Sequence, residues 1–161
     1  MKPKILIVED DPDASKALAI RLKADGFVVL HSITAINTLL LAREEQPDVI
    51  ILDLGLPDLD GYSILKELKE FPPTTCIPVI VLTARDPQGN QERSHETGAF
   101  EFFQKLVLVA AVQNVITNVI RFIEIIDYQI MSATVSARLR SRRFGFFVLR
   151  LAVNDARDAF L

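Results

Sequence analysis

Cysteine, histidine and long apolar runs are all scarce in this sequence of 161 residues. The single cysteine, Cys76, excludes an intrachain disulfide and suits a reducing compartment. The two histidines, His31 and His95, have no cysteine or carboxylate at the spacing of a metal site, so we expect neither to bind a metal. The apolar stretch 106–120 is interrupted by Gln, Asn and Thr residues and is too short and too polar for a membrane span.

A signal peptide is also not expected. The N-terminal residues MKPKILIVEDD become acidic after four apolar residues, whereas a signal peptide needs a longer apolar stretch and a small-residue cleavage site. We therefore expect a cytoplasmic protein without a membrane span.

Charge is distributed unevenly along the chain. Residues 1–130 carry 12 Lys and Arg against 19 Asp and Glu, whereas residues 131–161 carry 6 Arg against 2 Asp. Such an asymmetry can mark a tail with a partner of its own. We predict one domain over residues 1–126 and a C-terminal extension over 127–161, which we expect to be helical and to which we assign no role. For its arginines, a solvated basic face is favoured over binding to nucleic acid or anionic lipid.

Short apolar runs alternate with helical patterns over the first two-thirds of the chain. Continuous apolar runs such as KILIV are typical of strands that are buried on both faces of a parallel sheet. Right-handed crossovers between such strands place helices on both faces. The sequence therefore predicts an α/β fold with a doubly wound, five-stranded parallel sheet. The expected strands are residues 4–8, 27–30, 49–52, 78–82 and 100–103.

The last two expected helices have unusual compositions. Residues 86–97 contain almost no apolar side chain, and Gly89 and Asn90 disfavour a helix, so we predict a short or irregular helix that is more mobile than the rest. The next helix, from about Val107 to at least Ile126, is apolar on more than one face, which indicates burial on several sides. We favour a homodimer through this last helix over a tail that folds back onto it.

Polar side chains follow the expected strands. Glu9 and Asp10 follow the first strand, Asp53 the third, Thr83 the fourth and Lys105 the fifth. These positions converge at one edge of a parallel sheet, where ligands of such folds bind. Three close carboxylates repel one another, and a bound Mg²⁺ would remove this repulsion. A lysine can pair with a phosphoryl oxygen, so the set is suited to phosphoryl transfer onto an aspartate.

The segments ILIVEDDPD, IILDLGLPDLDGYSIL, PVIVLTA and GAFEFFQK resemble the response-regulator receiver domains of two-component signalling, over roughly residues 3–125. The resemblance implies a flavodoxin-like receiver fold with Asp53 as the phosphoacceptor. It also implies Mg²⁺ ligands, residues that contact the phosphoryl group, and residues that switch on activation. The implied ligands are Glu9, Asp10, Asp53 and the backbone carbonyl of Gly55; Thr83 and Lys105 would contact the phosphoryl group, and Thr83 and Phe102 would switch.

Leu106, Asp58 and Asp60 lie near these motifs, and each has a prediction of its own. Receivers usually have proline after the lysine, joined by a cis peptide, but here Leu106 follows Lys105. A cis bond without proline costs roughly 3–4 kcal/mol, so we favour a trans peptide with a displaced loop over a strained cis bond that the metal site would hold. Asp58 and Asp60 lie beside the site, and we expect them to serve the turn and the helix cap, not a metal.

The resemblance implies a response regulator that accepts a phosphoryl group from a sensor histidine kinase or a phosphotransfer protein and signals through a phosphorylation-controlled protein–protein interface. We do not expect an enzyme that acts on a separate substrate. A phosphate-independent interaction module stays open, because Leu106 and the polar fourth helix favour it. A truncated DNA-binding regulator also stays open, although the 35 residues after Ile126 show no helix-turn-helix pattern and nucleic-acid binding is not expected. A flavin protein would need a glycine- or serine-rich phosphate loop where this chain has acids.

Overall fold

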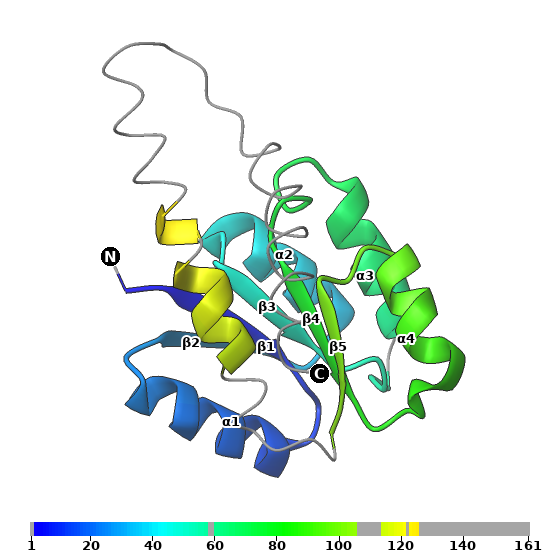
Figure 1. Cartoon of the computed structure of the whole chain (residues 1–161), viewed down its shortest axis with the longest axis horizontal. Coiled ribbons are helices and arrows are strands. Elements are labelled where there is room, and N and C mark those ends of the chain that lie inside the picture. Colours follow the sequence, from blue (N-terminus) through cyan, green and yellow to red (C-terminus); the bar gives the residue numbers. More distant parts are fainter. Residues whose placement is uncertain (1, 58–59, 106–113, 122, 126–161) are drawn as a thin grey trace. The chain divides into compact units, whose positions relative to one another are not determined.

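The computed structural model describes residues 2–57, 60–105, 114–121 and 123–125. Five parallel strands form one sheet in the order β2-β1-β3-β4-β5 (Figure 1). The predicted doubly wound sheet is confirmed, although β2, β4 and β5 each begin one residue later than predicted. The strands are β1 (Lys4–Val8), β2 (Val28–Ser32), β3 (Val49–Leu52), β4 (Val79–Thr83) and β5 (Glu101–Gln104).

Strand β1 pairs with β2 on one side and with β3 on the other, so that Val8 lies opposite both Ser32 and Leu52. The chain first runs outward from β1 to β2 and then crosses back to β3. The connections therefore diverge between β1 and β3, and ligands of such sheets bind beyond the carboxyl ends of the strands at this point. The topology therefore predicts a binding site at the residues that follow Val8 and Leu52.

Helix α1 (Pro12–Ala24) begins as its sequence predicts. Asp11 is the N-cap, and its carboxylate accepts hydrogen bonds from the backbone N–H groups of Asp13 (2.9 Å) and Ala14 (3.3 Å). Pro12 occupies the first turn, where a missing N–H does no harm. This cap fixes where the chain turns from β1 into α1, and so it also fixes the short acidic segment between them.

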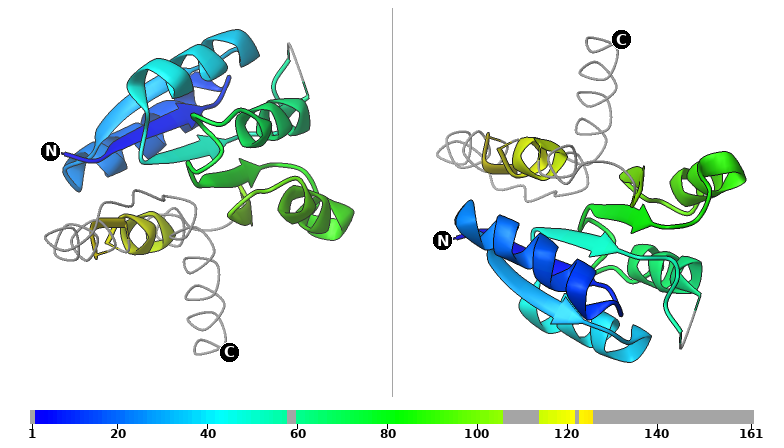
Figure 2. Two further views of the ribbon diagram at one scale, coloured as in Figure 1. Left: turned by 90° about the horizontal axis from the view of Figure 1, so that it is seen from above. Right: turned by 90° about the horizontal axis from the view of Figure 1, so that it is seen from below.

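Helices cover both faces of the sheet (Figure 2, left). Helix α1 lies on one face, and α2 (Ala35–Glu45), α3 (Gly61–Glu70) and α4 (Pro87–Glu96) lie on the other. Side chains alternate between the two faces of a strand. Accordingly, a buried cluster joins alternate strand residues to α2 and α3. Its members include Leu6, Val8, Ile50, Leu52, Val79 and Val81 of the sheet and Ala42, Ile64, Leu65 and Leu68 of the helices.

Helix α2 shows why a pattern of apolar residues does not identify the buried face. Two of its large apolar side chains, Ile36 and Leu40, are 82% and 48% exposed. The buried residues of α2 are Ala35, Thr38 and Ala42. Small side chains at these positions let the helix lie close to the sheet.

Helix α4 is irregular, as the sequence predicts. Gln88 (φ −59°, ψ 115°) and Gly89 (φ 73°, ψ −28°) are not helical, and the positive φ at Gly89 favours glycine. Ser94 is the one buried residue of α4. The helix therefore has no apolar face with which to pack, and polar contacts have to hold it in place.

The chain divides into two compact units, residues 1–113 and 114–161, and the sheet belongs to the first. In the second unit, residues 114–121 and 123–125 are helical, which confirms the predicted fifth helix over that part. Leu106, the start of that helix and the extension over 127–161 lie outside the described residues, and so do the predictions made for them. Across the part of the chain that is described, no helix has the length and apolarity that crossing a membrane requires.

Candidate functional site

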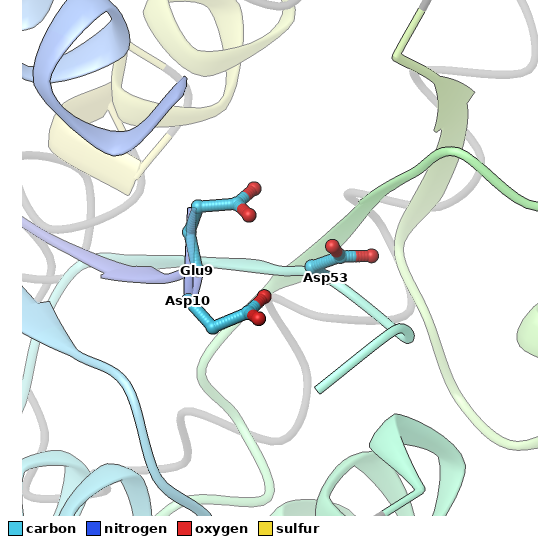
Figure 3. A group of neighbouring side chains, drawn as sticks. All are labelled: Glu9, Asp10 and Asp53. Carbon is cyan, nitrogen blue, oxygen red and sulfur yellow. The ribbon is translucent and has the colours of Figure 1, made fainter. Parts of the chain in front are cut away.

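Three acidic side chains meet at the carboxyl ends of β1 and β3. Glu9 and Asp10 directly follow β1, and Asp53 directly follows β3. One carboxylate oxygen from each residue lies within 4.8 Å of the others. Figure 3 shows the side chains of Glu9 and Asp10 extending from neighbouring positions toward Asp53. Glu9 and Asp53 are buried and Asp10 is exposed, so the sheet brings the predicted acidic residues together.

Lys105 extends into this cluster from the end of β5. Its backbone N–H donates to the carbonyl of Thr83 (2.7 Å), which continues the β4–β5 ladder by one residue. Its Nζ lies 2.7 Å from Asp53 Oδ2 and 2.7 Å from Glu9 Oε2. Burial lowers the pKa of the Lys105 amine, but the hydrogen bonds with Asp53 and Glu9 outweigh burial and raise it. Lys105 therefore remains charged and neutralises part of the acidic cluster.

Glu9 is a buried carboxylate of the cluster, and its pKa is shifted by its surroundings. Burial raises the pKa of the Glu9 carboxyl, and the hydrogen bonds from Lys105 and from the backbone of Asp11 (3.1 Å) offset this rise only in part. The negative charge of Asp53 raises the pKa of Glu9 further. A charged Glu9 is thus destabilising in the folded protein when no cation other than Lys105 is nearby.

This raised pKa predicts a pH dependence. Between the ordinary pKa of Glu9, 4.5, and its raised value, the folded protein binds more protons than the unfolded chain. The contribution of Glu9 to stability is therefore complete below pH 4.5 and is lost as the pH rises through the folded value. In EDTA, the free energy of unfolding of the parent should fall relative to that of Glu9→Gln as the pH rises. Urea titrations of both proteins at several pH values measure the difference, and a difference that is independent of pH would contradict the prediction.

The loop after β3 holds the Asp53 carboxylate. The backbone N–H of Gly55 donates to Asp53 Oδ1 (3.0 Å). Gly61, the first residue of α3, packs directly on this loop, because a Cβ at Gly61 would lie 2.5 Å from Leu54 Cα and 2.8 Å from the Asp53 carbonyl oxygen. The glycine of the Asp60-Gly61 pair is thus required for α3 to approach the loop.

The two predicted switch residues are both buried. Thr83 is the last residue of β4, and its Oγ1 accepts a hydrogen bond from the backbone N–H of Arg85 (3.3 Å). Phe102 lies in β5 opposite Val81 and belongs to the core cluster beneath α2 and α3. In this structure Phe102 packs in the core, and the role of Phe102 in switching stays a prediction.

Asp60 differs from its prediction as a capping residue. It occupies the N-cap position of α3, but its side chain makes no capping hydrogen bond. Asp60 Oδ1 lies 3.1 Å from Arg85 Nη2, and Asp60 Oδ2 lies 3.8 Å from Arg93 Nη2. The predicted cap role was therefore wrong for this side chain, because two arginines from beyond β4 compete for its oxygens. Asp58 lies outside the described residues.

The donor chemistry of the cluster fits a hard divalent cation. Three carboxylates supply oxygen ligands, one side of the cluster is open at Asp10, and Lys105 balances only one negative charge. Mg²⁺ prefers oxygen ligands and keeps several of its waters, which an exposed ligand such as Asp10 permits. The residues present therefore suit Mg²⁺ at the edge of the sheet.

The fold and this site define a doubly wound α/β domain with an acidic, lysine-bearing site at its topological switch point. The family model described as "Response regulator receiver domain" matches residues 5–117. The chain belongs to the response regulator receiver family.

Curated relatives agree with this assignment. The chain is 38% identical over 101 residues to the KDP operon transcriptional regulatory protein KdpE of Escherichia coli. The matched region covers 63% of this chain and 44% of KdpE. It is 33% identical over 105 residues to Response regulator PleD of Caulobacter vibrioides, in a match that covers 65% of this chain and 23% of PleD. It is 33% identical over 104 residues to Protein PilH of Pseudomonas aeruginosa, in a match that covers 65% of this chain and 86% of PilH. The match thus spans less than half of KdpE and PleD but most of PilH.

Solved structures show the same fold. A putative response regulator from Chloroflexus aurantiacus is 26% identical with a TM-score of 0.70, covering 74% of this chain and 98% of that one. The receiver domain of the sensor histidine kinase PA1611 from Pseudomonas aeruginosa is 29% identical with a TM-score of 0.67, covering 73% of this chain and 97% of that one. That structure has a magnesium ion coordinated in its active site cleft.

Proposed function

We propose that Asp53 accepts a phosphoryl group from a phosphohistidine of a sensor histidine kinase or a phosphotransfer protein. The observation that carries this proposal is the Lys105 ammonium 2.7 Å from Asp53 Oδ2, beside Glu9 and Asp10. A carboxylate oxygen of Asp53 forms a bond to phosphorus as the phosphorus–nitrogen bond of the donor breaks. The released imidazole takes up a proton from solvent. An acyl phosphate on Asp53 is the product.

Each residue of the site has a part in this transfer. Lys105 neutralises negative charge on the transferring group, and the Gly55 N–H holds the acceptor carboxylate through Oδ1. The buried hydroxyl of Thr83 is the group that would hydrogen-bond to the new phosphoryl oxygens. Glu9, Asp10, Asp53 and the carbonyl of Gly55 would hold Mg²⁺, which neutralises charge on the transferring group when it is bound.

The output would be a change at a protein–protein interface. Thr83 and Phe102 would transmit the phosphorylation of Asp53 to α4 and β5, and no separate substrate would be consumed. A homodimer through the last helix remains part of this proposal, as does a cytoplasmic location. A phosphate-independent module is the second candidate, favoured by the polar α4 and by Leu106 in place of proline.

Intact mass after incubation with acetyl phosphate and Mg²⁺ tests the proposal. The parent should gain one phosphoryl group, and the gain should be lost in EDTA and in Asp53→Asn. Asp48→Asn is the matched control, because Asp48 precedes the same strand at its other end and accepts a hydrogen bond from Lys4 N (2.7 Å) that asparagine can retain. Folded parent protein without an adduct would favour the phosphate-independent module.

A further inference from the structure

Helix α4 is attached to its neighbours by polar contacts. Its residues PQGNQERSHE offer no apolar side chain except that of Pro87, and Ser94 alone is buried. The Tyr62 hydroxyl, from α3, bonds to the Asn90 carbonyl (3.0 Å) and to Asn90 Oδ1 (2.9 Å). The Arg93 guanidinium lies 3.8 Å from the centroid of the Tyr62 ring. These contacts join α4 to α3 in the absence of an apolar interface.

Asp60 completes this attachment and links it to a second arginine. One of its carboxylate oxygens faces Arg93 of α4 (3.8 Å), and the other faces Arg85 of the β4–α4 loop (3.1 Å). The Arg85 guanidinium also lies near the same tyrosine, 5.9 Å from the ring centroid. We call Asp60, Tyr62, Arg85, Asn90 and Arg93 the polar clamp.

Arg85 also contacts the phosphoacceptor loop. Its Nη2 donates to the carbonyl of Leu54 (2.8 Å), the residue between Asp53 and Gly55. Its backbone N–H donates to the Thr83 hydroxyl (3.3 Å). A single arginine therefore joins the backbone beside the acceptor, the hydroxyl expected to contact the phosphoryl group, and the clamp that holds α4.

We propose that Arg85 is a positioning residue that ties α4 to the phosphoacceptor loop, and that phosphorylation of Asp53 opens the polar clamp. A phosphoryl group adds about 1.5 to 2 negative charges and three acceptor oxygens next to Leu54. These oxygens draw the Thr83 hydroxyl and the Arg85 guanidinium away from their present partners. Asp60 then loses its nearer arginine, and α4, which has no apolar face, loosens from α3. The opening of the clamp rests on the proposed phosphorylation of Asp53, whereas the existence of the clamp does not.

Hydrogen–deuterium exchange of residues 87–96, measured relative to residues 12–24 of α1 in the same sample, tests both steps. Asp60→Asn and Arg93→Gln should each speed exchange of α4 about 3- to 10-fold without phosphorylation, because partly exposed ion pairs are individually weak but here are coupled to a ring contact. Lys66→Gln is the control, since Lys66 lies on the same helix α3 and its side chain is 68% exposed. An unchanged ratio of α4 to α1 exchange in both clamp variants would overturn the clamp.

The same measurement with acetyl phosphate and Mg²⁺ tests the coupling. Phosphorylation should speed α4 exchange in the parent and in Lys66→Gln, and should add little in Asp60→Asn and in Arg85→Gln, where the clamp is already open. Equal responses in all four proteins would overturn the role of Arg85 while leaving phosphorylation intact. If intact mass shows no adduct on the parent, the proposed function and the coupling both fail, and the unphosphorylated samples still decide whether the clamp holds α4.

Discussion

We expect Lys105→Met to lower the free energy of unfolding by about 2 kcal/mol and to slow phosphorylation of Asp53 by about 100-fold. The stability effect arises because Glu9 and Asp53 are buried carboxylates, and Lys105 Nζ lies 2.7 Å from each. Removal of one partner of a fully buried pair costs roughly 3–5 kcal/mol. The expected loss is smaller here because the Lys105 side chain is 26% exposed and water can partly replace it.

The kinetic effect of Lys105→Met has a separate cause. The acceptor carboxylate and the incoming phosphoryl group are both negative, and the variant lacks the cation placed beside them. Losing one such preorganised group typically slows a reaction about 10²- to 10³-fold. Urea unfolding in EDTA measures stability, and the rate of adduct formation with acetyl phosphate and Mg²⁺ measures phosphorylation. Saturating Mg²⁺ should recover part of the lost stability, because it can neutralise the same carboxylates.

Lys4→Met is the matched control for Lys105→Met. Lys4 Nζ lies 3.1 Å from Glu45 Oε2 in a pair whose side chains are 37% and 46% exposed, far from the site along β1. Surface pairs of this kind contribute about 1 kcal/mol or less. Equal stability losses in the two variants would show that the buried carboxylates do not depend on Lys105.

The second large effect is expected at Gly61. Gly61→Ala should lower the free energy of unfolding by about 3 kcal/mol and should also slow phosphorylation, because overpacking against backbone atoms forces a shift. The added Cβ would lie 2.5 Å from Leu54 Cα and 2.8 Å from the Asp53 carbonyl oxygen, and neither atom can move without the loop. Urea unfolding and the acetyl phosphate assay measure the two effects.

Gly55→Ala provides the comparison within the same loop. A Cβ at Gly55 would lie 3.5 Å from the Asp53 carboxylate oxygens, which is ordinary van der Waals contact. Its effect on stability should therefore stay below about 1 kcal/mol. A Gly61→Ala variant as stable as Gly55→Ala would mean that α3 does not press on the acceptor loop as closely as described.

The identity of the strands and of the acidic site could be predicted from local sequence. Runs such as KILIV and VIIL are apolar on both faces, which is typical of the interior of a parallel sheet, and the alternation with helices then predicts right-handed crossovers with helices on both faces. The residues after such strands necessarily gather at one edge. Glu9, Asp10, Asp53 and Lys105 were found in this way, and the structure brings their side chains together.

The buried face of α2 and the role of Asp60 could not be predicted in the same way. Ile36 and Leu40 are apolar yet exposed, whereas the smaller Ala35, Thr38 and Ala42 of the same helix are buried. Asp60 stands where a helix cap is expected, but Arg85 and Arg93 reach it from 25 and 33 residues away. No local pattern encodes such contacts, since they depend on where β4 and α4 lie relative to α3.

The sequence by itself determined the parallel sheet, the acidic residues and lysine at its edge, and the irregularity of α4, because each follows from hydrophobic periodicity or from helix propensity within a short segment. Tertiary structure alone decided how that irregular helix is held. Asp60, Tyr62, Arg85 and Arg93 come together only after α3 has packed on the acceptor loop through Gly61 and β4 has paired with β3. Charge pairs between distant segments carry no sequence period, so their partners are selected by the packing of the apolar core and not by the sequence that surrounds them.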